Sequence, residues 1–192
     1  MSSDSEDPEE VEEDPRIARL YNFSDKQCDD DGLYNKDADG SAFVKMLDEV
    51  GTADAIVLGS LWAGKAVYAR AHFAVAALMD ADEMTVAKCL ELKRVPLKAC
   101  VKSGGEGAGV AMIAALERYT TTECEDKKLG VKAWAKLLQY LWEYEITTEE
   151  DIRAWNDDPR AAGCFMVAPT AAQDLRERSE KFFEWLEQGE AS

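Results

Sequence analysis

The sequence has a single histidine, His72, and five cysteines that are scattered without a C-x-x-C pair. One histidine in an alanine-rich apolar segment does not support a Ser/His/Asp or Cys/His catalytic set, and no cluster of ligands suits zinc. His72 is instead expected to be a packed or surface residue. The odd, scattered cysteines favour reduced thiols over a disulfide framework. We therefore expect no metal, no cofactor and no intrinsic catalysis.

Long apolar runs are also missing. No stretch approaches the roughly 20 apolar residues that a helix needs to cross a bilayer, and the start lacks a basic segment followed by an apolar one. We expect a cytoplasmic chain without direct membrane contact. Lys and Arg are few, 22 against 39 Asp and Glu, which gives a formal charge of -17. Since nucleic acid is bound by clustered basic residues, the charge points toward basic protein partners.

Residues 1–15, MSSDSEDPEEVEEDP, combine Asp and Glu with Ser and Pro and contain no basic residue. Such a segment repels itself and buries too little apolar surface to order. The stretch Arg16 to Phe23 leaves docking onto a domain open, but the following KQCDDDGLYNKDADG has turn and linker composition. We therefore assign residues 1–40 to an acidic flexible tail or linker and residues 41–188 to a folded domain.

Strand signals are absent from that domain, because no polar and apolar residues alternate between turn residues. Helical periodicities separated by short breaks predict helices over residues 41–50, 54–71, 73–79, 84–95 ended by Pro96, 97–102, 109–121, 132–144, 147–158 and 171–188. The prediction is an all-α fold of stacked antiparallel helical hairpins, a HEAT-like α-solenoid. We expect a monomer.

The stretch from Lys132 to Asp158 has the clearest pattern. Its first half places Trp134, Leu137, Leu138 and Leu141 on one apolar face. In its second half, Thr147 and Glu150 fit a capping box at a new helix start. Ile152 and Trp155 share one face of that helix, and the carboxylates project from the other side: Glu149, Glu150 and Asp157. The unit is predicted to be a hairpin that is apolar inside and acidic outside.

The last predicted helix divides in the same way. Leu175, Phe182 and Leu186 align on one side, and the opposite side is acidic: Glu177, Glu180, Glu184 and Glu187. An ordinary solvated face would explain this helix alone. Because two helices pair exposed carboxylates with tryptophan, we favour a surface that binds a basic partner.

Two other features have simpler interpretations. The glycine-rich SGGEGAG, residues 103–109, lacks the order of a phosphate-binding loop, so an interhelical loop is expected. One basic concentration stands out in the acidic chain: Lys88, Lys93, Arg94, Lys98 and Lys102. It is either solubilising charge or a second docking site for an acidic partner.

Several segments resemble a known family. FAVAALMDADEMTVAKCLELKRVPLKACVK, ALERYTT, WAKLLQYLWEYEITTEEDIRAW and EKFFEWLEQGEA resemble the HEAT-like domain that ends eukaryotic translation initiation factor five. The epsilon subunit of the exchange factor for initiation factor two ends in the same domain. The resemblance covers roughly Phe73 to Ala191, with SGGEGAG in place of a loop that is usually polar and basic. We favour factor five for two reasons. FAVAALMDADEMTV is similar to the segment that precedes the basic helix of its domain, and an acidic linker like residues 1–15 leads into that domain.

The resemblance implies an adaptor whose two aromatic and acidic boxes bind lysine-rich segments of the beta subunit of initiation factor two, with further contacts to initiation factors one and three. The first box corresponds to Tyr144, Glu145, Glu149, Glu150, Asp151 and Trp155, next to Asp157. The second box corresponds to Phe182, Phe183, Glu184, Trp185 and Glu187. The alternative is the catalytic domain of the exchange factor, which would accelerate GDP release.

Overall fold

The computed structural model describes residues 14–52, 66–79, 85–124, 127–158 and 165–190. Within these ranges every regular element is helical, apart from one isolated bridge between Cys28 and Tyr34, so the all-α prediction is confirmed. The predicted disorder of residues 1–13 lies outside the described ranges. The helices are α1 Pro15–Lys26, α2 Ser41–Val50, α3 Ala66–Leu78, α4 Val86–Leu92, α5 Arg94–Gly104, α6 Ala108–Arg118, the π-helix η2 Tyr119–Glu123, α7 Lys127–Lys132, α8 Trp134–Glu143, α9 Glu149–Asp157 and α11 Pro169–Glu190.

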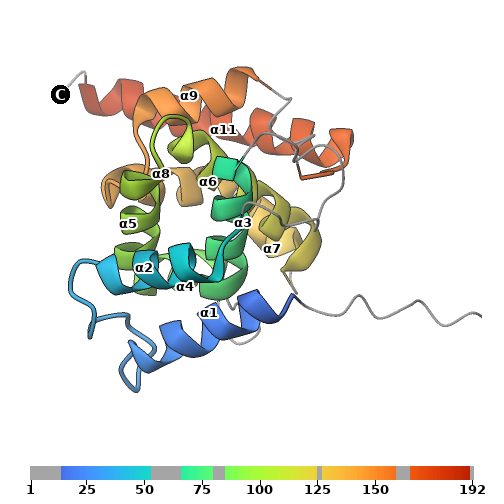
Figure 1. Ribbon diagram of the computed structural model, residues 1–192. Coiled ribbons are helices and arrows are strands. Elements are labelled where there is room, and N and C mark those ends of the chain that lie inside the picture. Colours follow the sequence, from blue (N-terminus) through green and yellow to red (C-terminus); the bar gives the residue numbers. More distant parts are fainter. Residues whose placement is uncertain (1–13, 53–65, 80–84, 125–126, 159–164, 191–192) are drawn as a thin grey trace, which may run out of the picture.

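Helices α3 and α6 form the centre of the molecule, with α1 and α2 on one side and α9 and α11 on the other (Figure 1). Helix α3 is apolar nearly all round, which is typical of a helix that neighbours cover on every side. Its residues from Ala71 to Val75 are all buried. His72 belongs to this core and lies beside the ring of Phe165. No helix of the described ranges has the length and apolarity of a membrane span.

The folded unit begins earlier than the sequence predicts. The carboxylate of Asp14 caps α1 by accepting from the amide of Arg16, and Leu20 of α1 is fully buried. The guanidinium of Arg16 lies over the ring of Phe73 in α3 and donates to the carbonyl of Gly51. Further on, Tyr34 is buried. The prediction that residues 1–40 form a flexible tail or linker is therefore wrong from Asp14 onward, because α1 packs against α3 and α2 and the amide of Tyr34 donates to the carbonyl of Leu92.

Pro96, which was predicted to end a helix, lies in the first turn of α5. Helix α4 ends at Leu92, and Pro96 is the third residue of α5. The first amides of a helix have no intrahelical acceptor, so a proline costs no hydrogen bond there. The chain thus turns at Lys93, three residues before the predicted break.

The capping box at the start of α9 is shifted by one residue from the prediction. Its members are Thr148 and Asp151, each bonded to the other's backbone amide. Thr147 does not cap α9 because its amide still donates to the carbonyl of Leu141 at the end of α8. Helix α9 ends at Asp157, before Pro159, as predicted.

Candidate functional site

Trp155, predicted to contact a partner, lies in the core. It is fully buried, and its indole N–H donates to a carboxylate oxygen of Glu117 over 2.8 Å. The other oxygen of Glu117 accepts from Arg176 over 2.7 Å, and the Arg176 guanidinium lies 4.4 Å from the centre of the Trp155 ring. Burial raises the pKa of Glu117, and the charge of Arg176 and the donated hydrogen bonds oppose that rise. Trp155 cannot contact a partner in the folded chain.

This buried cluster joins α6, α9 and α11. Sequence reasoning missed Glu117 and Arg176, although Glu117 ends an apolar run, where a charged residue calls for a buried partner. Breaking a buried ion pair by removing one partner costs about 3–5 kcal/mol, because the remaining charge is left without compensation. Trp155 of the first box therefore serves to hold α9 against α6 and α11, and the carboxylates of the box lie on α9 and on the turn before it.

Near the two boxes, the aromatic residues that reach the surface come from α8 and α11. Trp142 is 38% exposed and meets the ring of Trp185 edge-on, with ring centres 5.5 Å apart. Phe183 is half-buried beneath the guanidinium of Arg153, whereas Phe182 is buried and belongs to the core. Like Trp155, Phe182 was predicted to contact a partner but is buried in the structure. Trp142 was not among the predicted contact residues. Its position outside the apolar face of α8 could have indicated its exposure, because that face consists of Trp134, Leu137, Leu138 and Leu141.

The carboxylates around these rings differ in how far they are engaged. Asp151 is committed to the capping box, and Glu149 pairs with Arg153 over 2.7 Å. Four others are exposed and form no ion pair with a described residue: Glu150, Asp157, Glu184 and Glu187. On α11, the predicted apolar and acidic sides are both confirmed by burial. We call the exposed and half-buried residues of this surface the acidic-aromatic face: Trp142, Phe183, Trp185, Glu149, Glu150, Asp157, Glu184 and Glu187.

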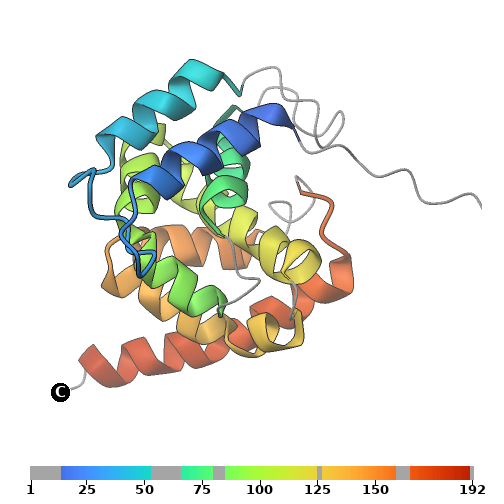
Figure 2. The same ribbon diagram turned by 90° about the horizontal axis from the view of Figure 1, so that it is seen from below.

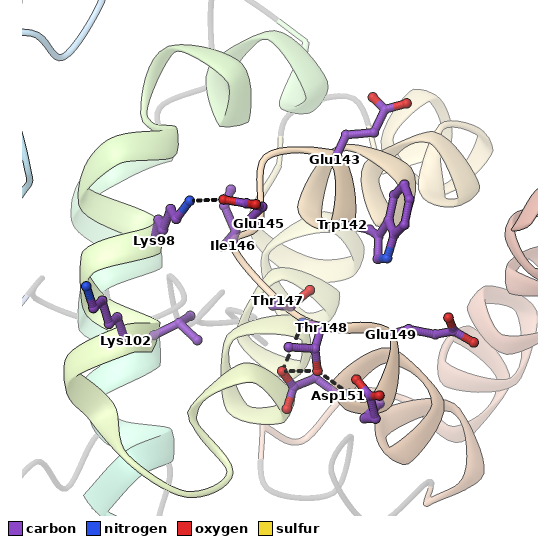
Figure 3. Close-up of a pocket in the computed structure, with 12 residues that line it drawn as sticks. Lys98, Lys102, Trp142, Glu143, Glu145, Ile146, Thr147, Thr148, Glu149 and Asp151 are labelled. Carbon is purple, nitrogen blue, oxygen red and sulfur yellow. Dashed lines mark hydrogen bonds and ion pairs between the residues drawn. The ribbon is translucent and has the colours of Figure 1, made fainter.

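The first box continues into a groove of about 770 Å³ between α5 and the turn that joins α8 to α9 (Figure 3). Its α5 wall carries Lys98, Val101 and Lys102. The opposite wall is acidic and includes Glu143, Glu145, Glu149, Glu150 and Asp151. Trp142 lines the groove and also contacts Trp185, so the groove adjoins the acidic-aromatic face.

An ion pair bridges the two walls. Lys98 and Glu145 lie 2.5 Å apart, and the hydrogen bond from Lys98 lowers the pKa of Glu145. Glu145 adopts a left-handed backbone conformation, with φ of 54°, directly after α8. Its neighbour Tyr144 is half-buried, stacked on Tyr140 with the guanidinium of Arg94 over its ring. Burial raises the pKa of Tyr144.

The predicted basic site does not form one open patch. Lys88 pairs with Glu91, Lys93 donates to the thiol of Cys28, and Arg94 donates to the carbonyl of Glu91. Lys98 is engaged with Glu145, so Lys102 alone of the five is exposed without an ion pair to a described residue. The structure brings Lys98 and Lys102 opposite the first box, which the sequence pattern did not indicate.

The glycines of the loop before α6 have separate roles. Gly105 and Gly107 both have φ of 77°, a conformation that other residues rarely adopt, and the loop joins α5 to α6 as predicted. Gly109 is different, because a Cβ there would lie 2.2 Å from the carboxylate of Asp151. Its missing side chain lets α6 lie against the first turn of α9.

Comparison with known proteins gives a match to one part of the chain. No curated protein and no solved structure gives a significant match to the chain. The family model that matches, over residues 108–192, is W2, described as eIF4-gamma/eIF5/eIF2-epsilon. The matched range runs from α6 through α11 and contains the buried cluster and the acidic-aromatic face, while the resemblance drawn for residues 73–107 lies outside it. Over residues 108–192, this chain is thus similar to the W2 family of eIF4-gamma, eIF5 and eIF2-epsilon.

Proposed function

We propose that the chain is an adaptor that binds lysine-rich segments of other translation initiation factors through the acidic-aromatic face. The observation that carries the proposal is that the exposed Trp142 meets the half-buried Trp185 beside four exposed carboxylates, Glu150, Asp157, Glu184 and Glu187, which form no ion pair with a described residue. Opposite charges steer encounter and fix register. The rings supply apolar surface for lysine stems and attract the ammonium groups above them.

The contact residues of this proposal differ from those of the two boxes. Trp155, Phe182 and Asp151 hold the face in place, because each is engaged in the core or in the cap of α9. The acidic-aromatic face makes the contacts with the partner. It contains Trp142 in addition to residues of the two boxes. Removing a contact residue should change affinity, whereas removing a supporting residue should change stability.

We further propose that the lysine-rich partner is the beta subunit of initiation factor two, with initiation factors one and three as additional partners. The W2 match supports initiation factors as the class of partner, and the resemblance to factor five supports these members of it. The proposed role is that of a monomeric, non-catalytic assembly domain acting in the cytoplasm. The exchange-factor role remains the second candidate, since the matching family includes eIF2-epsilon.

The proposal is tested by reversing charges on the face. We expect Glu184→Lys combined with Glu187→Lys to weaken the binding of a lysine-rich peptide by about tenfold or more, because two attractions become repulsions. Both side chains are exposed, so the thermal midpoint should stay unchanged. Affinity should also fall as salt rises, because exposed charges are screened beyond about 8 Å at physiological ionic strength.

The matched control reverses two exposed carboxylates elsewhere, Asp30→Lys with Asp31→Lys. They lie in the loop after α1, on the side of the molecule away from α11 (Figure 2). The control changes the net charge by the same amount. If it weakened binding as much as the double reversal on α11, only total charge would matter and the proposed face would be wrong. Isothermal titration calorimetry at several salt concentrations measures both.

A further inference from the structure

The groove beside the acidic-aromatic face has walls of opposite charge, and the proposed function does not use the basic wall on α5. A surface for lysine alone needs no cation of its own, yet Lys98 and Lys102 line the α5 wall (Figure 3). Lys98 is held by Glu145 on the opposite wall. Lys102, exposed in a chain of net charge -17, forms no ion pair with any described residue. One wall therefore offers carboxylates and the other an available ammonium group.

A second observation concerns a buried polar side chain that lines the groove. Thr147 lines it and is only 4% exposed, and its hydroxyl has no hydrogen-bond partner among the described residues. Buried polar side chains in folded proteins are nearly always hydrogen-bonded. A segment bound in the groove would bring backbone groups to the wall that contains Thr147. Val101 and Ile146 supply apolar surface in the same groove.

The groove adjoins the proposed face, because Trp142 lines it and also contacts Trp185 of α11. A segment lying across α11 with its lysines on the carboxylates would enter the groove past Trp142. Its continuation would then lie opposite Lys102. Like charges placed together repel, so a lysine is disfavoured at that point and a carboxylate is favoured.

We propose that the groove binds the end of the lysine-rich segment and selects an acidic residue there, which pairs with Lys102. This inference rests on the proposed function for the lysine part and adds the class of residue that must flank it. The partner is thus a peptide of mixed charge, with a run of lysines and an Asp or Glu directly beyond one end of the run. Lys102 is the specificity-determining residue.

The test compares two capped peptides with the same lysine run, one flanked by an Asp-Asp pair and the other by Asn-Asn. Each is made with the pair before and after the run, since chain direction is a variable. For one direction we expect the Asp peptide to bind the wild-type chain about two- to fivefold tighter, the range of an exposed ion pair. Net charge alone predicts the reverse, because the Asp peptide is less basic and the chain is acidic.

The variant Lys102→Glu should invert the order, so that the Asn peptide binds more tightly than the Asp peptide. The matched control, Lys128→Glu, makes the same charge change at an exposed lysine of α7, which does not line the groove, and should keep the wild-type order. If the Asn peptide binds wild type more tightly in both directions, the groove proposal is overturned while lysine binding stands. If neither peptide binds, the proposed function fails with it.

Analytical ultracentrifugation completes the test, because the groove could instead hold another copy of the chain. We expect a monomer for both wild type and Lys102→Glu at the concentrations used for binding. A dimer of the wild type that dissociates in Lys102→Glu would assign the groove to a second copy and overturn the proposal.

Discussion

The indole of Trp155 donates to Glu117 across 2.8 Å inside the core, although the two residues are 38 positions apart in the chain. Arg176 closes the arrangement by donating to both Glu117 and the carbonyl of Trp155. Three helices of the region that matches the W2 family are thus tied at one buried point. A tryptophan that sequence patterns place in a binding motif serves here to hold the helices that carry the proposed binding surface.

This arrangement predicts that Trp155→Phe lowers stability without a direct effect on binding. Phenylalanine keeps most of the apolar volume but removes the donor to Glu117, and a buried group left without a partner costs about 1–3 kcal/mol. Urea denaturation measures the loss. Under conditions where the variant is folded, its affinity for a lysine-rich peptide should equal that of the wild type.

The companion variant is Trp142→Ala, whose side chain is partly exposed. It should weaken peptide binding with a smaller change in stability. The opposite outcome, in which Trp155→Phe is as stable as the wild type but binds poorly, would place Trp155 at the contact and contradict the assignment.

Close packing of α6 against α9 predicts that Gly109→Ala is destabilising. The added Cβ would lie 2.2 Å from the carboxylate of Asp151, which also caps α9. Overpacking of this kind costs about 1–3 kcal/mol. Gly189→Ala is the control, because a Cβ there meets nothing within 4 Å and alanine favours a helix. Thermal unfolding should show Gly109→Ala below the wild type and Gly189→Ala at or above it.

Burial of His72 predicts a loss of stability at mildly acidic pH. Desolvation lowers the pKa of His72, an effect that Arg118 assists and Glu123 and Asp14 oppose. Below the unfolded pKa of about 6.5, the unfolded chain therefore binds more protons than the folded one. The stability contributed by neutral His72 is complete above that pH and is lost as pH falls through the window below it.

The free energy of unfolding, measured from pH 7 to pH 5, tests this in the wild type and in His72→Gln. The glutamine side chain does not titrate in this range, so the variant should show a shallower decline. Carboxylates are common to both proteins, and their contribution cancels in the comparison. Parallel declines in the two proteins would mean that His72 has the same pKa in the folded and unfolded chains.

The two candidate functions differ in their effect on nucleotide release. As an adaptor, the chain should leave GDP release from initiation factor two unchanged or slow it, since a ligand that favours the GDP-bound state can only retard departure. Stopped-flow fluorescence of labelled GDP, with and without excess chain, measures this rate. A concentration-dependent acceleration that Trp185→Ala abolishes would establish the exchange-factor role instead.

Helix content and the acidic outer side of α11 could be predicted from the sequence. Leu175, Phe182 and Leu186 repeat at helical spacing, and this local periodicity determines which side of a helix is buried. The interhelical role of the glycine-rich loop and the end of α9 before Pro159 followed from local backbone preferences in the same way. Such signals act within a few residues and need no knowledge of the rest of the fold.

Tertiary contacts decided the features that span longer distances. Arg176 lies 59 positions from Glu117, and no local pattern indicates that one neutralises the other. Whether Leu20 of α1 belongs to the domain depends on α3 and α2, the helices against which α1 packs. The sequence by itself determined that carboxylates and aromatic rings recur near the C-terminus. Only packing decided that Trp155 is buried and Trp142 exposed, because the depth of a side chain depends on which helices lie over it.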